Sequence, residues 1–334
     1  MIDTNNEINS ALFQYFGSSS FDIDISKGGM NNTTCFVRIK GNKYILRIYR
    51  SHSDEAKVCY ELEVLNALRE NNFPLKIPNP ITSLEGKPFI RTVEGNIAVV
   101  FKYMEGKNPD FFRLNELCSF GFACGTLTKA LDSLVLMGTP AYRPYYEIES
   151  AYPECPLDKV LEFCRNPPYE FTRHKVYLAS IRQQLELLKD RIPSFRDLPH
   201  QIIHGDLNAS NVLADERGNI CGILDFEYVT YDLRAMELAV CLSDTIQYTE
   251  GEGSVWERIQ SIMNGYKRAV VLEKDELKAI PALLNLRRLD VFVHFLNRYW
   301  KGIDGPEVLK KRILNNMDHF KWVFDNCPID QLII

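Results

Sequence analysis

The sequence predicts an α+β fold in which a small antiparallel sheet is followed by a mainly helical region. Strand-like runs joined by short turns occupy the first third of the chain, and helical periodicity dominates from residue 111 onward. The turn-forming segment Glu105–Pro109 separates these two patterns. We therefore expect an N-terminal lobe of residues 1–104 and a C-terminal lobe of residues 105–334.

Four strand-like runs define the expected sheet. The runs 35–39 and 43–49 flank the turn residues Gly41-Asn42, which is the arrangement of a β-hairpin. The runs 88–93 and 96–104 form a second pair later in the lobe. Together they predict a compact antiparallel sheet.

A helix is expected between the two strand pairs. Asp54 is a favourable N-cap, and the helix should run to about Arg69, before Pro74. Its apolar stripe has helical spacing and consists of Val58, Leu62, Leu65 and Leu68.

The C-terminal lobe is predicted to be helical with one exception. Apolar residues recur every three or four positions from Leu178 to Ile192, which indicates an amphipathic helix. The exception is a hairpin, with 211–214 and 220–226 as its strands around a polar turn at 215–219.

Composition excludes several classes of protein. The net charge is −5 with both signs mixed, so we expect no nucleic-acid partner. The N-terminus lacks the pattern of a secretory signal, and no apolar run approaches the ~20 residues of a membrane-spanning helix. A cytoplasmic protein is expected. The nine cysteines include no C-x-x-C pair, which argues against a zinc site or a disulfide framework.

The residues with the strongest chemical signal lie in the segment 202–227. A loop followed by a hairpin can bring together Asp206, Asn211 and Asp225, two carboxylates and one amide oxygen at strand ends. Carboxylates in such places require a cation or a reacting proton. Oxygen ligands of this kind suit Mg²⁺, which completes its octahedron with phosphate oxygens and water.

This segment, with its pattern H-G-D-x-x-x-x-N, hairpin and D-F, resembles the catalytic and metal loops of the aminoglycoside phosphotransferase and choline kinase superfamily. The resemblance implies a protein-kinase-like, two-lobed fold and transfer of the ATP γ-phosphate to a hydroxyl of a small molecule. It implies that Asp206 is the catalytic base and that Asn211 and Asp225 bind Mg²⁺. The likeness extends through 121–133 and 262–300 and is closest to type II homoserine kinases.

The resemblance also assigns supporting roles near the catalytic segment. His204 is expected to hydrogen-bond nearby backbone rather than to act as a base. Glu237 is expected to be structural and could brace the catalytic loop through hydrogen bonds.

The nucleotide site implied by the resemblance begins in the segment 26–39. Gly28 and Gly29 occupy the place of the family's glycine-rich loop, although G-x-G-x-x-G is absent. Arg47 stands where the family usually has a phosphate-binding lysine; it is always charged but longer and planar. Glu61 matches the helix glutamate that pairs with that cation. In the hinge, the backbone of Lys102, Tyr103 and Met104 is expected to face the adenine edge.

The acceptor is left open by the sequence. A homoserine site needs a cation for the substrate carboxylate, for which the late helices offer Arg287, Arg288 and Arg298, although arginines on helices usually face solvent. An aminoglycoside site needs an acidic wall, for which the chain offers Glu147, Glu149, Asp290 and Asp304. The aromatic stretch 142–153 either lines a pocket or covers the core of the second lobe.

An alternative of another class is a catalytically inactive kinase-fold protein with a binding or structural role. Arg47 in place of lysine is the feature that favours it. A protein kinase proper is disfavoured because the chain has neither an H-R-D loop nor an A-P-E motif. The sequence therefore predicts a small-molecule kinase that uses ATP and Mg²⁺.

Overall fold

The chain divides into two units in the computed structural model, whose described residues are 4–18, 20–25, 32–50, 52–246 and 251–315. Unit 1 comprises Met1–Lys107, Val135–Ala141 and Cys221–Glu227, and unit 2 comprises Asn108–Leu134, Tyr142–Ile220 and Tyr228–Ile334. Each unit draws on three stretches of chain, whereas the predicted boundary between residues 104 and 105 is a single cut. That boundary stays a prediction.

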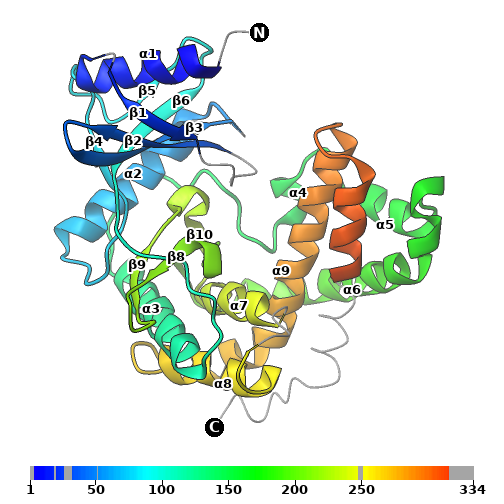
Figure 1. The fold of residues 1–334 in the computed structure, drawn as a ribbon. Coiled ribbons are helices and arrows are strands. Elements are labelled where there is room, and N and C mark those ends of the chain that lie inside the picture. Colours follow the sequence, from blue (N-terminus) through cyan, green and yellow to red (C-terminus); the bar gives the residue numbers. More distant parts are fainter. Residues whose placement is uncertain (1–3, 19, 26–31, 51, 247–250, 316–334) are drawn as a thin grey trace. The chain divides into compact units, whose positions relative to one another are not determined.

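Unit 1 contains a six-stranded antiparallel sheet (Figure 1). Its strands are β1 (Asp22–Ile25), β2 (Asn32–Ile39), β3 (Asn42–Tyr49), β4 (Asn79–Ile81), β5 (Ile90–Arg91) and β6 (Ile97–Lys102). The order is β1-β2-β3-β6-β4, and β5 also pairs with β6. The predicted hairpin is present, but its turn is Lys40-Gly41 rather than Gly41-Asn42. Both turn residues have positive φ, 48° and 81°, which suits the right-handed twist of the strands.

Helix α2 (Glu55–Glu70) is the helix predicted between the strand pairs. The Asp54 side chain caps it by accepting the N–H of Ala56 at 2.9 Å. Its apolar stripe is buried, as predicted: Val58, Leu62, Leu65 and Leu68.

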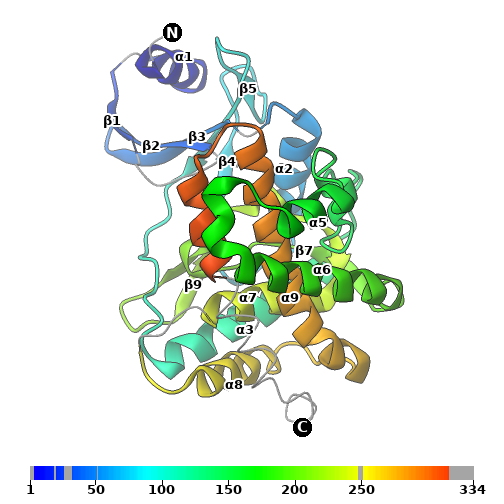
Figure 2. The same ribbon diagram turned by 90° about the vertical axis from the view of Figure 1, so that its right-hand side faces the viewer.

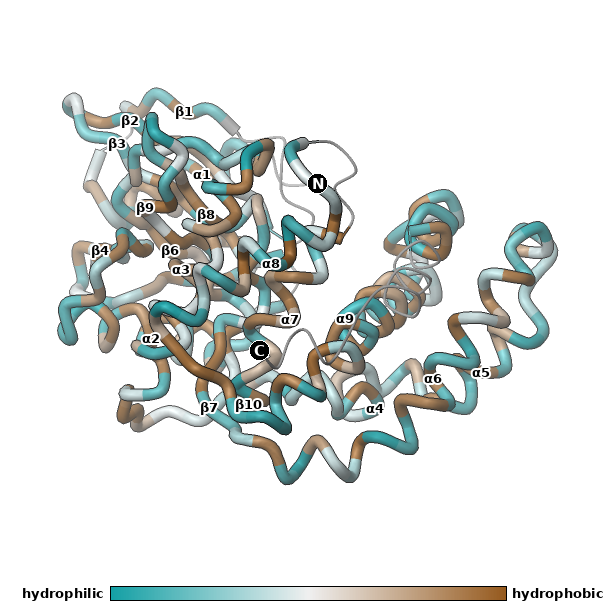
Figure 3. Tube along the Cα trace, turned by 90° about the horizontal axis from the view of Figure 1, so that it is seen from below, coloured by the Kyte–Doolittle hydropathy of each residue, from teal (hydrophilic) through white to brown (hydrophobic). Residues whose placement is uncertain are grey.

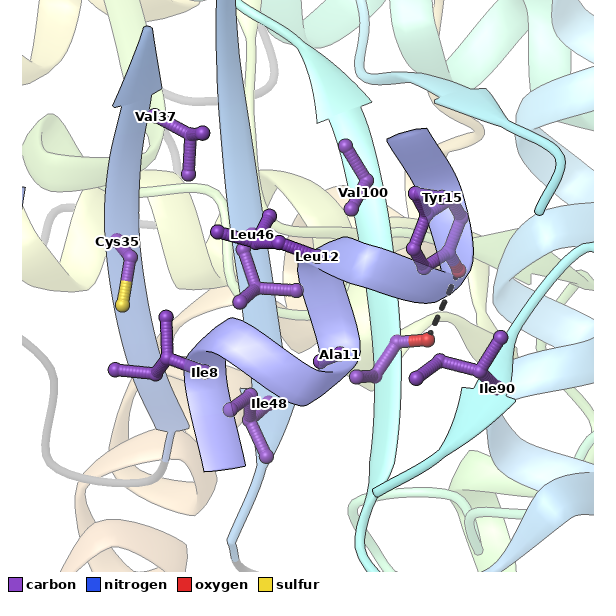
Figure 4. Close-up of a cluster of buried hydrophobic side chains, with 11 residues drawn as sticks. Ile8, Ala11, Leu12, Tyr15, Cys35, Val37, Leu46, Ile48, Ile90 and Val100 are labelled. Atoms are coloured by element: carbon purple, nitrogen blue, oxygen red, sulfur yellow. Dashed lines mark hydrogen bonds between the residues drawn. The ribbon is translucent and has the colours of Figure 1, made fainter. Parts of the chain in front are cut away.

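Helix α1 (Thr4–Phe16) was not predicted and covers one face of the sheet (Figure 4). Its buried residues recur at helical spacing and are Ile8, Ala11, Leu12 and Tyr15. They pack against strand residues that include Leu46, Ile48 and Val100, and the Tyr15 hydroxyl donates to the carbonyl of Ala98 at 3.1 Å. Because side chains alternate along a strand, the odd-numbered residues of β3, including Arg47, lie on the opposite face.

Unit 2 is mainly helical (Figure 2). Its main helices are α3 (Leu114–Asp132), α4 (Ile148–Ala151), α5 (Leu157–Arg165), α6 (Lys175–Phe195), α7 (Arg234–Thr245), α8 (Val255–Tyr266) and α9 (Lys274–Trp300). Helix α9 packs on α6 and α7, and Figure 3 shows hydrophobic residues recurring along it. The predicted α+β class is confirmed.

Short strands flank the segment that carries Asp206. Strand β7 (His200–Ile203) pairs antiparallel with β10 (Thr230–Leu233), a pair that was not predicted. The predicted hairpin is present as β8 (Val212–Ala214) and β9 (Ile220–Ile223). Among the described residues, no helix has the length and apolar character needed to cross a lipid bilayer.

Helices α3 and α8 make a close backbone contact at glycines. A Cβ on Gly265 would lie 1.9 Å from the carbonyl oxygen of Cys118, and one on Gly121 would lie 2.0 Å from that of Ile262. The obstacle is backbone, so no side-chain rotation relieves it. This contact therefore requires glycine on both helices.

We expect Gly265→Ala to lower the free energy of unfolding by roughly 1–3 kcal/mol or more, because overpacking forces the two helices apart. Urea denaturation would measure the loss. Gly305→Ala is the control, since a Cβ there meets nothing within 4 Å. Equal stability of the two variants would contradict the close packing of α3 and α8.

Candidate active site

The loop that carries Asp206 follows β7 and is held by a buried glutamate of α7. Glu237 Oε2 accepts the backbone N–H of His204 at 2.5 Å and that of Gly205 at 3.4 Å. Burial raises the pKa of the Glu237 carboxyl. His204 is fully buried, and its Nδ1 accepts the N–H of Asp206 at 3.2 Å. These contacts match the supporting roles expected for His204 and Glu237.

The predicted base and one predicted metal ligand lie next to each other in unit 2. The Asn211 side-chain nitrogen donates to the Asp206 carbonyl at 2.8 Å and to Asp206 Oδ2 at 3.0 Å. With its amide nitrogen turned toward Asp206, Asn211 directs its amide oxygen away from this carboxylate. Asn211 is buried, whereas the side chain of Asp206 is 22% exposed. The spacing D-x-x-x-x-N therefore builds a fixed loop with a carboxylate that solvent reaches.

Arg287, on α9, contacts the predicted base, which sequence reasoning did not foresee. Its Nη2 lies 2.5 Å from Asp206 Oδ1, and its side chain is only 18% exposed. The expectation that the late-helix arginines face solvent is wrong. Arg288 is buried and donates to the Ser243 carbonyl, and Arg298 pairs with Asp304 at 2.6 Å. The missed signal is that apolar residues surround Arg287 on α9, which indicates a helix buried on several sides.

Tyr145, in the aromatic stretch 142–153, supports the same loop. Its hydroxyl donates to the Gly205 carbonyl at 2.5 Å and accepts from Arg287 Nη1 at 2.7 Å. Asp290, one turn beyond Arg287, has a carboxylate oxygen 3.9 Å from the same guanidinium. Burial raises the pKa of Asp290 to about 6 even though Arg287 opposes the shift.

Arg47 in unit 1 binds two carboxylates. Its Nη1 lies 3.3 Å from Glu61 Oε1 and 3.0 Å from Asp225 Oδ1. Burial alone would lower the pKa of Arg47, but Asp225 and the other acidic groups around it outweigh burial and raise it. Burial raises the pKa of Glu61 to about 7 against the effect of Arg47. The pairing expected between Arg47 and Glu61 is present, and Asp225 joins it.

Asp225 belongs to unit 1 through the segment Cys221–Glu227, whereas Asn211 belongs to unit 2. Backbone bonds between this segment and Lys76 hold it: the N–H of Lys76 donates to the Cys221 carbonyl at 3.0 Å, and the N–H of Ile223 to the Lys76 carbonyl at 2.8 Å. Asp225 has a φ of +60°, which is uncommon outside glycine but tolerated by aspartate. Its side chain is 32% exposed.

The other predicted nucleotide residues lie partly on the same sheet. Strand β6 ends at Lys102, and the N–H of Tyr103 donates to the Lys43 carbonyl at 3.2 Å. Tyr103 lines a pocket of about 310 Å³ in unit 1 together with Phe36 and Lys43. Met104 follows outside the sheet. Gly28 and Gly29 lie outside the described residues.

Comparison with known proteins places the chain in a family. The model of the phosphotransferase enzyme family matches residues 24–268, so the chain belongs to that family. This confirms the aminoglycoside phosphotransferase and choline kinase superfamily and the predicted enzyme class, a small-molecule kinase.

Curated relatives are similar over most of the chain. A homoserine kinase of Paramagnetospirillum magneticum is 26% identical over 266 residues, which are 76% of this chain and 74% of that protein. A homoserine kinase of Sinorhizobium fredii is 24% identical over 293 residues, 85% of this chain and 81% of that protein.

Solved structures share the fold at low identity. The amicoumacin kinase hAmiN, in complex with AMP-PNP, Ca²⁺ and Ami, has a TM-score of 0.71 at 16% identity and covers 98% of this chain and 95% of its own. A microcompartment-associated aminopropanol kinase has a TM-score of 0.69 at 17% identity, with coverage of 97% and 98%. The kinase-like, two-lobed fold class is confirmed.

Proposed function

We propose that this kinase transfers the γ-phosphate of ATP, with Mg²⁺, to a hydroxyl of a small amino acid or amino alcohol. The observation that carries the proposal is the loop after β7, where Glu237 and Asn211 fix Asp206 and leave its carboxylate partly exposed. The curated relatives named homoserine kinase support an acceptor of this class.

Asp206 is the proposed general base. It accepts the proton of the acceptor hydroxyl as the hydroxyl oxygen bonds to the γ-phosphorus, while the bond from that phosphorus to the bridging oxygen of ADP breaks. Arg47 is the proposed phosphate-binding cation, held by Glu61 at 3.3 Å. The backbone of Lys102, Tyr103 and Met104 is proposed to meet the adenine edge, and Gly28 and Gly29 the phosphates.

Asn211 and Asp225 are the proposed Mg²⁺ ligands. Within the described residues no three His, Cys, Asp or Glu side chains are arranged to hold a metal, but Mg²⁺ bound with phosphates commonly uses only one or two carboxylates. The two residues fit that chemistry, because Asn211 turns its amide nitrogen toward Asp206 and Asp225 keeps a partly exposed carboxylate. The bound ion would neutralise charge on the β- and γ-phosphates.

The test is turnover with Mg·ATP and a panel of homoserine, choline, methylthioribose and aminoglycosides. We expect ADP and a phosphorylated product with at least one acceptor, detected by mass spectrometry. Thermal unfolding with Mg·ATP adds an independent readout, because a ligand at 100 times its dissociation constant stabilises by ~2.7 kcal/mol. If no phosphorylated product forms and Mg·ATP does not stabilise the protein, the proposal is eliminated.

The second candidate is an inactive kinase-fold protein that binds a partner or has a structural role. The ion pair of Arg47 with Asp225 favours it, because this pair engages one oxygen of the proposed metal ligand. Stabilisation by Mg·ATP without any phosphorylated product would favour a binding role, and turnover would exclude the second candidate.

A further inference from the structure

Arg287 lies inside a set of contacts that belong entirely to unit 2. Its two terminal nitrogens point to different partners, Nη2 to Asp206 at 2.5 Å and Nη1 to the Tyr145 hydroxyl at 2.7 Å. Burial alone would lower the pKa of Arg287, but Tyr145, Asp206 and Asp290 outweigh burial and raise it. Arg287 is therefore a permanent positive charge beside the proposed base.

The pair with Arg287 conflicts with the proposed role of Asp206 as general base. A general base must present a carboxylate oxygen to the acceptor hydroxyl, and an oxygen that is paired with a guanidinium is not open to that hydroxyl. Asp206 Oδ2 already accepts from Asn211 at 3.0 Å, and Oδ1 is the oxygen that faces Arg287. As long as this pair persists, both carboxylate oxygens of Asp206 are engaged by side chains of the protein.

A second anion would relieve the conflict. A guanidinium offers five donors in a planar fork that matches a carboxylate, so a carboxylate on the acceptor can compete with Asp206 for Arg287. Asp290 lies three residues further along α9, with a carboxylate oxygen 3.9 Å from the guanidinium. Asp290 is itself buried, so only Arg287 is assigned to the acceptor, as the partner of its carboxylate.

We propose that Arg287 is the acceptor-recognition residue of this kinase: it pairs with Asp206 when no acceptor is bound and turns to the carboxylate of a hydroxy amino acid when one binds. The base is thereby released by the acceptor itself. Without acceptor, attack of water on the γ-phosphorus, which would yield ADP and phosphate, remains slow. This inference rests on the proposed function, since it assigns a role relative to Asp206 as base.

The test uses the full chain with Arg287→Met, and Arg287→Lys as the variant that keeps the charge. Two acceptors differ only in the carboxylate: homoserine carries it, and 3-aminopropan-1-ol lacks it. We expect the wild type to prefer homoserine in kcat/KM and Arg287→Met to lose roughly 10–100-fold with homoserine, the effect of one hydrogen bond to a charged group. Turnover of 3-aminopropan-1-ol should change far less, and Arg287→Lys should restore part of the preference.

The second readout is ADP release with Mg·ATP and no acceptor. Arg287→Met should hydrolyse ATP several-fold faster than the wild type, a gain that a damaged fold would not produce. Arg298→Met is the matched control, because it removes an ion pair of 2.6 Å with Asp304 on the same helix and should change neither readout.

The outcomes separate the two proposals. A wild type that phosphorylates no acceptor overturns the proposed function and the inference with it. A wild type that uses both acceptors equally overturns the role of Arg287 alone. Equal losses on both acceptors in Arg287→Met, without faster acceptor-free hydrolysis, would assign Arg287 a purely structural role and also overturn the inference.

Discussion

Asp206→Asn is expected to lower kcat by roughly 10²–10⁴-fold, the usual contribution of a general base. The amide keeps the shape of the side chain and can still accept a bond, but it cannot take the hydroxyl proton. Because the proposed nucleotide residues, such as Arg47, are unaltered, Mg·ATP should stabilise this variant as it does the wild type. Turnover assays and thermal unfolding with Mg·ATP measure the two effects.

Asp244→Asn is the matched control for this prediction. Asp244 Oδ2 accepts the backbone N–H of Ala209 at 3.3 Å, so it supports the same loop without being a proposed base. Asp244→Asn should therefore lower kcat far less than Asp206→Asn does. If Asp206→Asn turns over at the wild-type rate, Asp206 is not the general base, irrespective of the activity of Asp244→Asn.

The loop that carries Asp206 could be predicted because its contacts are local in sequence. Five positions separate Asp206 from Asn211, and a single turn after a strand brings them within 3.0 Å. Glu61 and Arg47 were predicted as a pair from the family pattern, and the 3.3 Å contact is present. Contacts of this kind depend on a few residues whose identity carries the signal.

Long-range contacts could not be predicted in the same way. Arg287 meets Asp206 across 81 positions, and only the packing of α9 on α6 and α7 turns it inward. Helix α1 shows the same limit, because its stripe of Ile8, Ala11 and Leu12 is short and owes its stability to the sheet beneath it. Strand β4 was missed because proline is uncommon inside strands, and Pro80 lies in the middle of it.

Asp225→Asn is expected to raise the Mg²⁺ concentration required for half-maximal activity by at least about 10–100-fold, the loss seen when even the groups supporting a metal ligand are removed. An amide oxygen is a neutral and weaker ligand than a carboxylate. Turnover at saturating ATP over a range of Mg²⁺ concentrations measures the shift.

Glu61→Gln distinguishes a metal ligand from a mere partner of Arg47. Glu61 and Asp225 both contact Arg47 Nη1, at 3.3 and 3.0 Å, but only Asp225 is a proposed Mg²⁺ ligand. If Asp225 acts only by positioning Arg47, the two variants should raise the KM for ATP alike and leave the Mg²⁺ requirement unchanged. We expect Asp225→Asn to raise the Mg²⁺ requirement and Glu61→Gln to leave it unchanged. The reason is that both carboxylates contact Arg47 but only that of Asp225 is proposed to bind the cation.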